Sequence, residues 1–256
     1  MLETLKIWQH QGKQFIADVV ASKPAGFKMG FPVISANITE EESKKCAAIC
    51  PTKAISSPEF SIDMGKCLFC GECERMLGSE KINFTNDTHT ATNMRENLIV
   101  VAGQTEPIYI DQDKIRKEIQ TYFGRSLKLR QISAAGDNSC EWELNACGNP
   151  NFDMGRFGIE FVASPRHADG IVITGPISEN MAEATQICYD AVCNPKLIIL
   201  AGTDAISGGI YVDSPAINRS FLAKYPIDLY VPGNPIHPLT FINGVLELTR
   251  GKKLKY

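Results

Sequence analysis

The 256-residue sequence lacks the long apolar runs and the excess of charge that mark proteins of membranes or nucleic acids. No stretch approaches the ~20 apolar residues of a membrane-spanning helix. The start, Met1–Trp8, lacks the apolar core of a signal peptide. A formal net charge of −3 leaves no strong attraction for nucleic acid or for an anionic membrane surface. We therefore expect a cytoplasmic protein that reaches a membrane only through partners in a complex.

Motifs for nucleotide binding and for hydrolysis are also lacking. The sequence contains no G-x-G-x-x-G fingerprint, no Walker loop and no serine-triad motif. Its composition, 44% hydrophobic and 21% charged, is that of an ordinary globular protein, and its length suffices for two domains. These absences leave the cysteines as the most informative feature of the chain.

Nine cysteines in a chain without an export signal indicate a reducing compartment and metal ligation rather than disulfides. Three of them, Cys67, Cys70 and Cys73, have C-x₂-C-x₂-C spacing, and Cys50 precedes Pro51. In two-cluster bacterial ferredoxins the run C-x₂-C-x₂-C-x₃-C-P occurs twice, and the fourth cysteine of each run ligates the cluster of the other run. The sequence therefore predicts one 4Fe–4S cluster on these four cysteines. A zinc site also uses C-x₂-C pairs, but this spacing favours iron–sulfur.

The second cluster of such a repeat is predicted to be missing. Its ligand positions are Glu40, Ser43, Cys46 and Leu77, so that one thiol of four remains. Iron–sulfur clusters require thiolates, and one thiolate does not hold a cubane. We interpret Cys46 as a small buried apolar residue left from a lost site.

The remaining pattern divides the chain into four parts. Residues 1–30 form an N-terminal segment, 31–88 a small α+β bacterial ferredoxin-like domain, 89–126 a linker with strands and a helix, and 127–256 an α/β domain. In the first half we expect strands at Phe31–Ile34, Phe60–Ile62, Glu96–Ala102 and Pro107–Ile110, and a helix at Asp113–Phe123. In the second half we expect strands at Leu127–Ile132, Ile159–Val162, Gly170–Thr174, Lys196–Ala201 and Leu229–Val231, and helices at Ser178–Cys193 and Pro238–Arg250. Alternation of short apolar runs with helices predicts a parallel sheet covered on both faces.

The second half resembles a known family from Phe123 to Lys253, most specifically in Ser164–Pro176. Further matching segments are Phe123–Arg130, Pro195-Lys196, Gly202–Ala205 and Pro232–Pro235. The family is the small subunit of energy-converting nickel–iron hydrogenases, shared with the quinone-proximal cluster subunit of respiratory complex I. Some members look like fusions with an N-terminal ferredoxin domain. The resemblance implies a flavodoxin-like α/β fold with one 4Fe–4S cluster on loops beyond the strand ends.

Most cysteines of that family cluster are absent from the matching positions, which are Asp137, Cys140, Asp204 and Asn234. The pocket could lack a cluster and be filled by these side chains and water. Its carboxylates could instead hold an unusual cluster or a harder ion. Thirdly, Cys147, Cys188 or Cys193 could have been recruited, although core positions are the expected role of these three.

The resemblance implies an electron-transfer subunit of a hydrogenase-like or complex I-like multisubunit oxidoreductase. Its ferredoxin domain would carry one 4Fe–4S cluster, and its α/β domain would dock on a large subunit and could also contact membrane-arm subunits. Glu141 matches an acidic residue of the family that faces the large subunit, or is a charge in the first turn of a helix. We expect no complete active site in this chain alone. The alternative is a non-redox scaffold or assembly subunit with a structural cluster.

Overall fold

A parallel β-sheet of five strands organises the C-terminal half in the computed structural model, which describes residues 2–12 and 14–251. The strands are β6 (Leu127–Ser133), β7 (Ile159–Phe161), β8 (Gly170–Thr174), β9 (Leu197–Ala201) and β10 (Leu229–Val231). They lie in the order β10-β9-β8-β6-β7. Counted along the chain from β6, this is the flavodoxin-like order 2-1-3-4-5. The expected α/β sheet is therefore present, and residues 252–256 of the range 127–256 lie outside the described residues, as does Met1.

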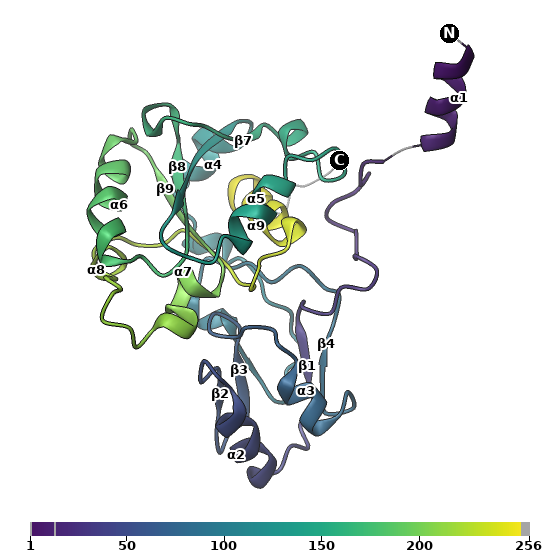
Figure 1. Ribbon diagram of the computed structural model, residues 1–256, viewed down its shortest axis with the longest axis vertical. Helices are drawn as coiled ribbons and strands as arrows, with labels where there is room; N and C mark the ends of the chain where they lie inside the picture. Colours follow the sequence, from purple (N-terminus) through teal and green to yellow (C-terminus); the bar gives the residue numbers. More distant parts are fainter. Residues whose placement is uncertain (1, 13, 252–256) are drawn as a thin grey trace.

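Helices cover both faces of this sheet (Figure 1). One face packs against α4 (Lys117–Phe123), α5 (Ser139–Ala146) and α9 (Pro238–Arg250), and the other packs against α6 (Glu179–Ala191) and α8 (Ser220–Lys224). Every residue of β8 and β9 is buried. Successive side chains of a strand point to opposite faces, so Val172 packs with the α9 side while Ile171 and Ile173 pack with Phe221 on the α8 side. Two covered faces explain the uninterrupted apolar runs of these strands.

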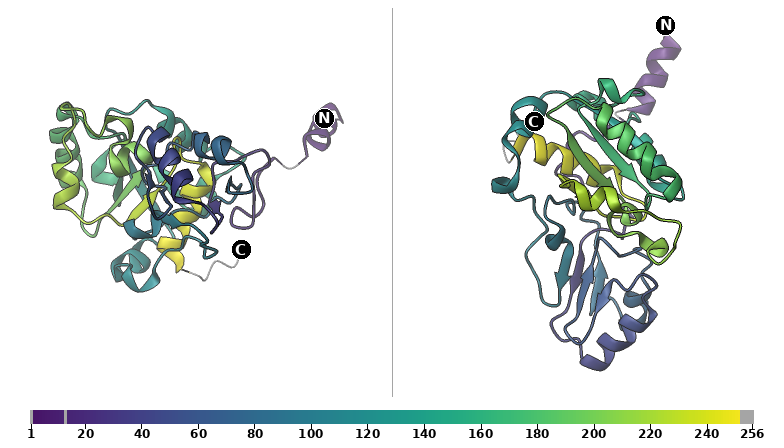
Figure 2. Two further views of the ribbon diagram at one scale, coloured as in Figure 1. Left: turned by 90° about the horizontal axis from the view of Figure 1, so that it is seen from below. Right: turned by 90° about the vertical axis from the view of Figure 1, so that its left-hand side faces the viewer.

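The cysteine-bearing region precedes this sheet and lies below it in Figure 1 and in the right-hand view of Figure 2. Its antiparallel strands are β1 (Pro32–Ile34) with β4 (Ile82–Phe84), and β2 (Ile55–Ser56) with β3 (Ser61–Asp63) and β5 (Ile99–Val101). Its helices are α2 (Glu40–Ile49) and α3 (Glu72–Leu77). Thr39 and Glu42 form a capping box at the start of α2.

Three expectations for the linker are wrong. The strand expected at Glu96–Ala102 begins only at Ile99, after a 3₁₀ turn (Arg95–Leu98). No strand occurs at Pro107–Ile110, because side chains take its backbone hydrogen bonds: Thr92 donates to the carbonyl of Tyr109. The helix expected at Asp113–Phe123 begins only at Lys117, after a short 3₁₀ turn (Gln112–Lys114). Arg116 has extended backbone, and its guanidinium reaches the carboxylate of Asp228 at 2.9 Å. This contact ties the linker to the sheet.

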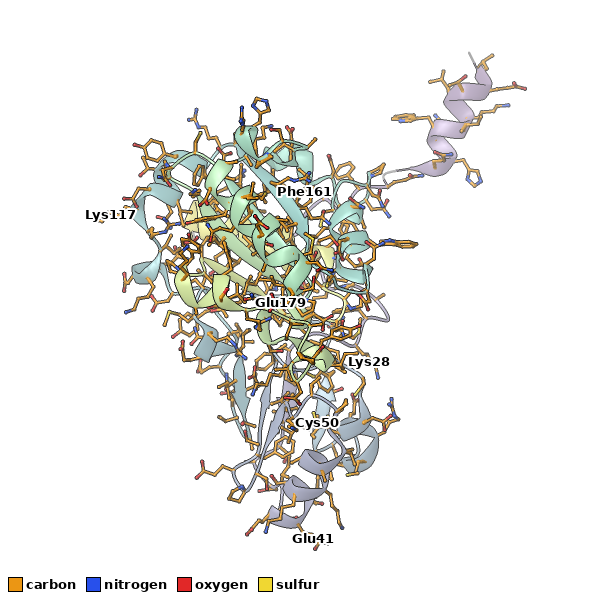
Figure 3. The ribbon with its side chains drawn as sticks, turned by 60° about the vertical axis from the view of Figure 1, so that its left-hand side comes forward. Lys28, Glu41, Cys50, Lys117, Phe161 and Glu179 are labelled. Atoms are coloured by element: carbon orange, nitrogen blue, oxygen red, sulfur yellow. The ribbon has the colours of Figure 1, made fainter. Side chains whose placement is uncertain are left out.

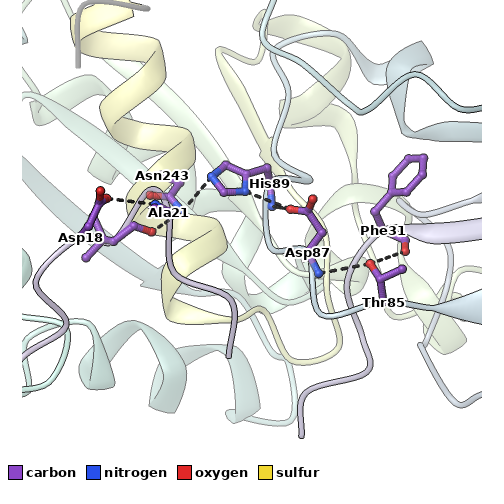
Figure 4. A network of polar contacts seen from close by, with 8 residues as sticks. Asp18, Ala21, Phe31, Thr85, Asp87, His89 and Asn243 are labelled. Carbon is purple, nitrogen blue, oxygen red and sulfur yellow. Dashed lines mark hydrogen bonds and ion pairs between the residues drawn. The ribbon is translucent and has the colours of Figure 1, made fainter. Parts of the chain in front are cut away.

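A polar network joins the N-terminal segment, the loop after β4 and α9 (Figure 4). The amide of Asn243 donates to the carbonyl of Val19 at 3.0 Å and lies 3.5 Å from the ring of His89. The other ring nitrogen of His89 lies 2.9 Å from the carboxylate of Asp87, and this hydrogen bond lowers the pKa of Asp87 to about 2. The network holds segments from three parts of the chain in one body.

The first helix, α1 (Leu2–Gln11), projects away from the rest of the protein and has no buried residue (Figure 1). Its apolar side chains Leu2, Leu5, Ile7 and Trp8 are all exposed. Across residues 2–12 and 14–251, the helices are all too short or too polar to span a membrane.

The approach of α9 to the loop before Thr92 leaves no room for a side chain at Gly244. A Cβ at this position would lie 2.5 Å from Cβ of Ala91. In an open helix, Gly→Ala stabilises by up to ~1 kcal/mol. Here we expect Gly244→Ala to lower the free energy of unfolding by about 1–3 kcal/mol through overpacking. Urea denaturation followed by circular dichroism measures this change.

The matched control is Ala91→Gly in the Gly244→Ala background. Removing the opposing methyl should restore part of the lost stability, which gives a negative coupling energy in the double-mutant cycle. Additive effects of the two substitutions would contradict the close packing of α9 on this loop.

Candidate iron–sulfur pocket and its neighbouring loops

The four cysteines of the predicted cluster line one pocket. Cys50 comes from the C-terminal end of α2, while Cys67, Cys70 and Cys73 come from the loop before α3 and its first turn. Apolar side chains complete the lining, among them those of Pro51, Ile55, Ile62 and Phe84. Cys67 and Cys73 are buried, Cys50 is half-buried and Cys70 is exposed. The fold thus brings together two segments that the sequence separates; Figure 3 marks Cys50 between the sheet and the far end of α2.

Local backbone geometry shapes the loop that carries three of these cysteines. Gly71 has a φ of +74°, the left-handed conformation that glycine adopts without steric cost, and it begins α3. Arg75 on α3 donates to the carbonyl of Cys70 at 2.9 Å. The ring of Phe69 packs edge-on against Phe84, with centroids 5.9 Å apart. The ring contact holds the loop against β4, and the hydrogen bond from Arg75 holds it to α3.

Burial raises the pKa of the Cys67 thiol well above its usual range and that of Cys73 to about 12. The charges of neighbouring thiolates add to both shifts. At Cys67 a backbone hydrogen bond lowers the pKa in opposition to burial, because the N–H of Phe69 donates to its Sγ at 3.3 Å. The N–H of Ala54 donates to Cys50 Sγ at 3.2 Å. Burial disfavours the charged thiolate, so a thiolate in such surroundings needs a cation beside it. A bound metal supplies that charge and keeps its coordinating thiols deprotonated.

The thiols of these cysteines border a cavity instead of meeting at one point. Within residues 2–12 and 14–251, no three His, Cys, Asp or Glu side chains converge on a point that could hold one metal ion. A 4Fe–4S cubane takes one cysteine at each of four separate irons, so its ligands surround a volume instead of meeting at a point. The four predicted ligands line one pocket, as the ligands of such a cluster would.

The other ligand positions of the two-cluster repeat are occupied by the protein's own contacts. Glu40 is on the surface in an ion pair with Lys44, and the hydroxyl of buried Ser43 donates to the carbonyl of Ser56. Leu77 packs against the apolar core. Cys46 is fully buried, as expected, but it lines the same pocket as the other four cysteines, which the repeat pattern did not predict.

A second group of predicted residues lies at the carboxyl ends of the parallel strands. Cys140 is buried in the first turn of α5, and its sulfur packs so closely on Gly202, after β9, that a Cβ there would collide with it. Burial raises the pKa of Cys140 to about 12. A backbone hydrogen bond from Ile236 opposes this shift, and the charges of Glu141, Asp137 and Asp204 add to it. The fold therefore brings Asp137, Cys140 and Asp204 together; Asn234 follows Gly233 in the loop after β10.

The polar atoms of these residues differ in their surroundings. Asp137 is exposed and accepts hydrogen bonds from the backbone and hydroxyl of Ser139, at 2.9 and 2.6 Å. Asp204 is 9% exposed, and its Oδ1, buried against Gly209, has no hydrogen-bond partner among the described residues. Burial, followed by the charges of Asp137 and Glu141, raises the pKa of Asp204 to about 6, and Arg219 opposes this shift.

Glu141 occupies the point where the strand order reverses, between β6 and β8. Its carboxylate accepts hydrogen bonds from Ser133 at 2.6 Å and Thr174 at 2.7 Å, the last residues of these two strands. It is 5% exposed and so does not face outward, as an acidic residue at a subunit surface would. Its neighbour Trp142 is the exposed side chain of this turn, at 71%.

Thr203 connects the two groups of residues, and sequence reasoning missed it. Its hydroxyl donates to the carbonyl of Cys67 at 2.7 Å, and its backbone N–H donates to the carbonyl of Gly233 at 2.9 Å. Thr203 begins α7 (Thr203–Ser207), directly before Asp204. Ile206 of this helix belongs to the same apolar cluster as Met64 and Phe69. The loop with three cysteines therefore sits on the edge of the sheet where the second group lies.

The other cysteines do not join these groups. Cys147 is fully buried and its thiol donates to the carbonyl of Glu143, as expected for a core residue. Cys188 is half-buried on α6. Cys193 is exposed, so its expected core position is wrong; the helix ends at Ala191 and leaves it in the following loop.

Comparison with known proteins identifies the family. Residues 138–248 match the NADH ubiquinone oxidoreductase 20 kDa subunit family. The chain is 33% identical over 125 residues to the probable membrane-bound hydrogenase subunit mbhJ of Pyrococcus furiosus, covering 49% of this chain and 75% of that protein. The chain belongs to the NADH ubiquinone oxidoreductase 20 kDa subunit family.

Other proteins are similar to this chain over comparable lengths. An NADH-quinone oxidoreductase subunit of Heliobacterium modesticaldum is 41% identical over 149 residues, which cover 57% of this chain and 84% of that protein. A chain in the structure of the membrane-bound sulfane sulfur reductase, an archaeal respiratory membrane complex, is 29% identical. The match covers 51% of this chain and 73% of that one, with a TM-score of 0.43. The family match lies within the part of the chain that forms the α/β sheet and its helices.

The raised pKa of Asp204 predicts a pH-dependent stability. A carboxyl whose pKa is higher in the folded than in the unfolded protein stabilises the fold below about pH 4, and this contribution is lost as pH rises through about 6. We expect Asp204→Asn, which cannot ionise, to gain about 2 kcal/mol in free energy of unfolding relative to wild type between pH 4.5 and 7.5. Urea denaturation across this range measures the difference.

The matched control is Asp190→Asn, because Asp190 is exposed on α6. The stability change that it causes at each pH is subtracted from that of Asp204→Asn, which leaves the effect specific to the buried carboxyl. A constant difference for Asp204→Asn would show that the carboxyl of Asp204 titrates alike in the folded and unfolded chains.

Proposed function

We propose that this protein is the iron–sulfur electron-transfer subunit of a hydrogenase-like or complex I-like multisubunit oxidoreductase. Membership of the 20 kDa subunit family supports a place in such a complex. In this proposal one 4Fe–4S cluster, held in a ferredoxin-like domain, is bound by Cys50, Cys67, Cys70 and Cys73. The observation that carries it is the pocket lined by these four thiols, which come from two separate segments of the chain.

A 4Fe–4S cluster in this pocket would accept and release one electron at a time. The residues around it set the conditions for that exchange. Ile55, Ile62 and Phe84 keep water from the inner side, and the backbone N–H groups of Ala54 and Phe69 donate to ligand sulfurs. Exposed Cys70 leaves one side open to a redox partner, while Cys67 faces the edge of the sheet through Thr203.

The second group of residues, Asp137, Cys140, Asp204 and Asn234, is proposed to hold no cluster. Close packing of the Cys140 sulfur on Gly202 and the carboxylates at two of the expected thiolate positions support this view. The α/β domain would then dock on a large subunit, with exposed Trp142 in the contact, since Trp is enriched at protein interfaces. Attachment to membrane-arm subunits would come through that complex.

Iron and acid-labile sulfide analysis of anaerobically purified protein tests the cluster count. We expect about four irons per chain, because the chain has one complete set of ligands. Cys70→Ser should remove most of the iron. The control Cys140→Ser should leave it unchanged, because Cys140 lies outside the pocket. About eight irons, or iron loss in Cys140→Ser, would mean that the second group of residues also binds iron.

A redox titration followed by electron paramagnetic resonance distinguishes electron transfer from a structural role. We expect a reversible one-electron signal that appears on reduction and disappears on reoxidation without loss of iron. A scaffold with a structural cluster predicts the contrary: no accessible redox transition, together with unfolding when iron is removed.

A further inference from the structure

Cys46 lines the pocket of the proposed cluster although the ferredoxin pattern assigns it to the other, missing cluster. Its side chain is fully buried. The other positions of the missing site are taken by an ion pair, a hydrogen bond and an apolar contact. Among the described residues, no second complete set of ligands surrounds Cys46. The cavity that it borders is the one lined by the four proposed ligands.

The position of Cys46 relates it to two of those ligands. It lies four residues before Cys50, on the same side of α2, with a helical rise of about 6 Å between them. Cys73, the ligand on α3, lines the same cavity, and α3 packs on α2. Cys46 thus shares one cavity with a ligand from each of the two segments that form the pocket.

Cys50 is the ligand best placed for replacement. It is half-buried, whereas Cys46 is fully enclosed. Cys50 also follows the last residue of α2 and has extended backbone, so the chain can shift there without unwinding the helix. Replacement of Cys73 would instead require a change within α3, which packs on α2.

We propose that Cys46 is a reserve ligand for the cluster, able to take the corner of Cys50. With a cluster bound, the exchange would break the bond between iron and the Cys50 sulfur and form one between the same iron and the Cys46 sulfur. The proton of the Cys46 thiol leaves, the released Cys50 thiolate takes one up, and no electron is transferred. The inference rests on the proposed function, because it requires the cluster to be in this pocket.

Four variants test the exchange: Cys50→Ala, Cys46→Ala, the double variant, and Cys50→Ala with Cys147→Ala. Alanine has no ligating atom, and Cys147 is an equally buried cysteine outside the pocket. Iron and sulfide content and electron paramagnetic resonance are measured on anaerobically purified protein. We expect about four irons in wild type, in Cys46→Ala, in Cys50→Ala and in the Cys147 control, with altered resonance positions wherever Cys50 is absent. The double variant should lose the 4Fe–4S signal.

Two outcomes separate the failure of this inference from that of the proposed function. Wild type with four irons, but Cys50→Ala with a three-iron cluster or none, overturns the reserve role alone. Wild type without iron overturns the cluster proposal and the reserve role with it.

If Cys50→Ala fails to fold, the rate of iron release tests the inference instead. Iron release to a chelator is compared in wild type, Cys46→Ala and Cys147→Ala, each of which retains all four proposed ligands. A thiol that rebinds iron when Cys50 dissociates slows release, so Cys46→Ala should lose iron several-fold faster than the other two proteins. Equal rates in all three would overturn the inference.

Discussion

The parallel direction of the sheet is the constraint on which the arrangement of this protein depends. Because the strands all run the same way, the loops after β6, β9 and β10 emerge at one edge. Cys140, Asp204 and Asn234 reach that edge from three distant parts of the sequence. The loop with Cys67 docks on the same edge through the hydroxyl of Thr203. The parallel direction of the strands and the contact through Thr203 thus place the two groups of candidate residues next to each other.

The cost of burying thiolates explains why the two groups have different chemistry. Around the pocket of the cysteine-bearing region lie four thiols and two backbone N–H groups that donate to sulfur, and iron bound there, as we propose, would offset the cost of burial. At the edge of the sheet a single thiol is packed against Gly202, and the nearby acids raise its pKa further. Carboxylates beside a buried thiol disfavour its ionisation, so these surroundings do not favour a thiolate ligand.

Much of the α/β fold could be predicted from the sequence, because parallel strands covered on both faces leave a clear pattern. The bounds of β8, β10 and α9 agree with those expected from short apolar runs and from Pro238 at the start of the helix. The linker could not be predicted in the same way. Pro107–Ile110 has the residues of a strand, yet the side chains of Thr92 and Asn97 donate to the carbonyl of Tyr109, and these contacts depend on residues 17 and 12 positions away.

The spacing of the cysteines by itself predicted that Cys50, Cys67, Cys70 and Cys73 lie together, because cluster ligands follow a spacing rule that can be recognised without knowledge of the fold, and the four do line one pocket. The family motifs likewise indicated that Asp137, Cys140 and Asp204 lie together. Only the tertiary structure decided the direction in which side chains point. It turned Glu141 inward to the strand ends, joined Cys67 to Thr203 across 136 positions of sequence, and directed Cys46 into the pocket of its neighbours. Such directions result from packing between distant segments, which no local pattern records.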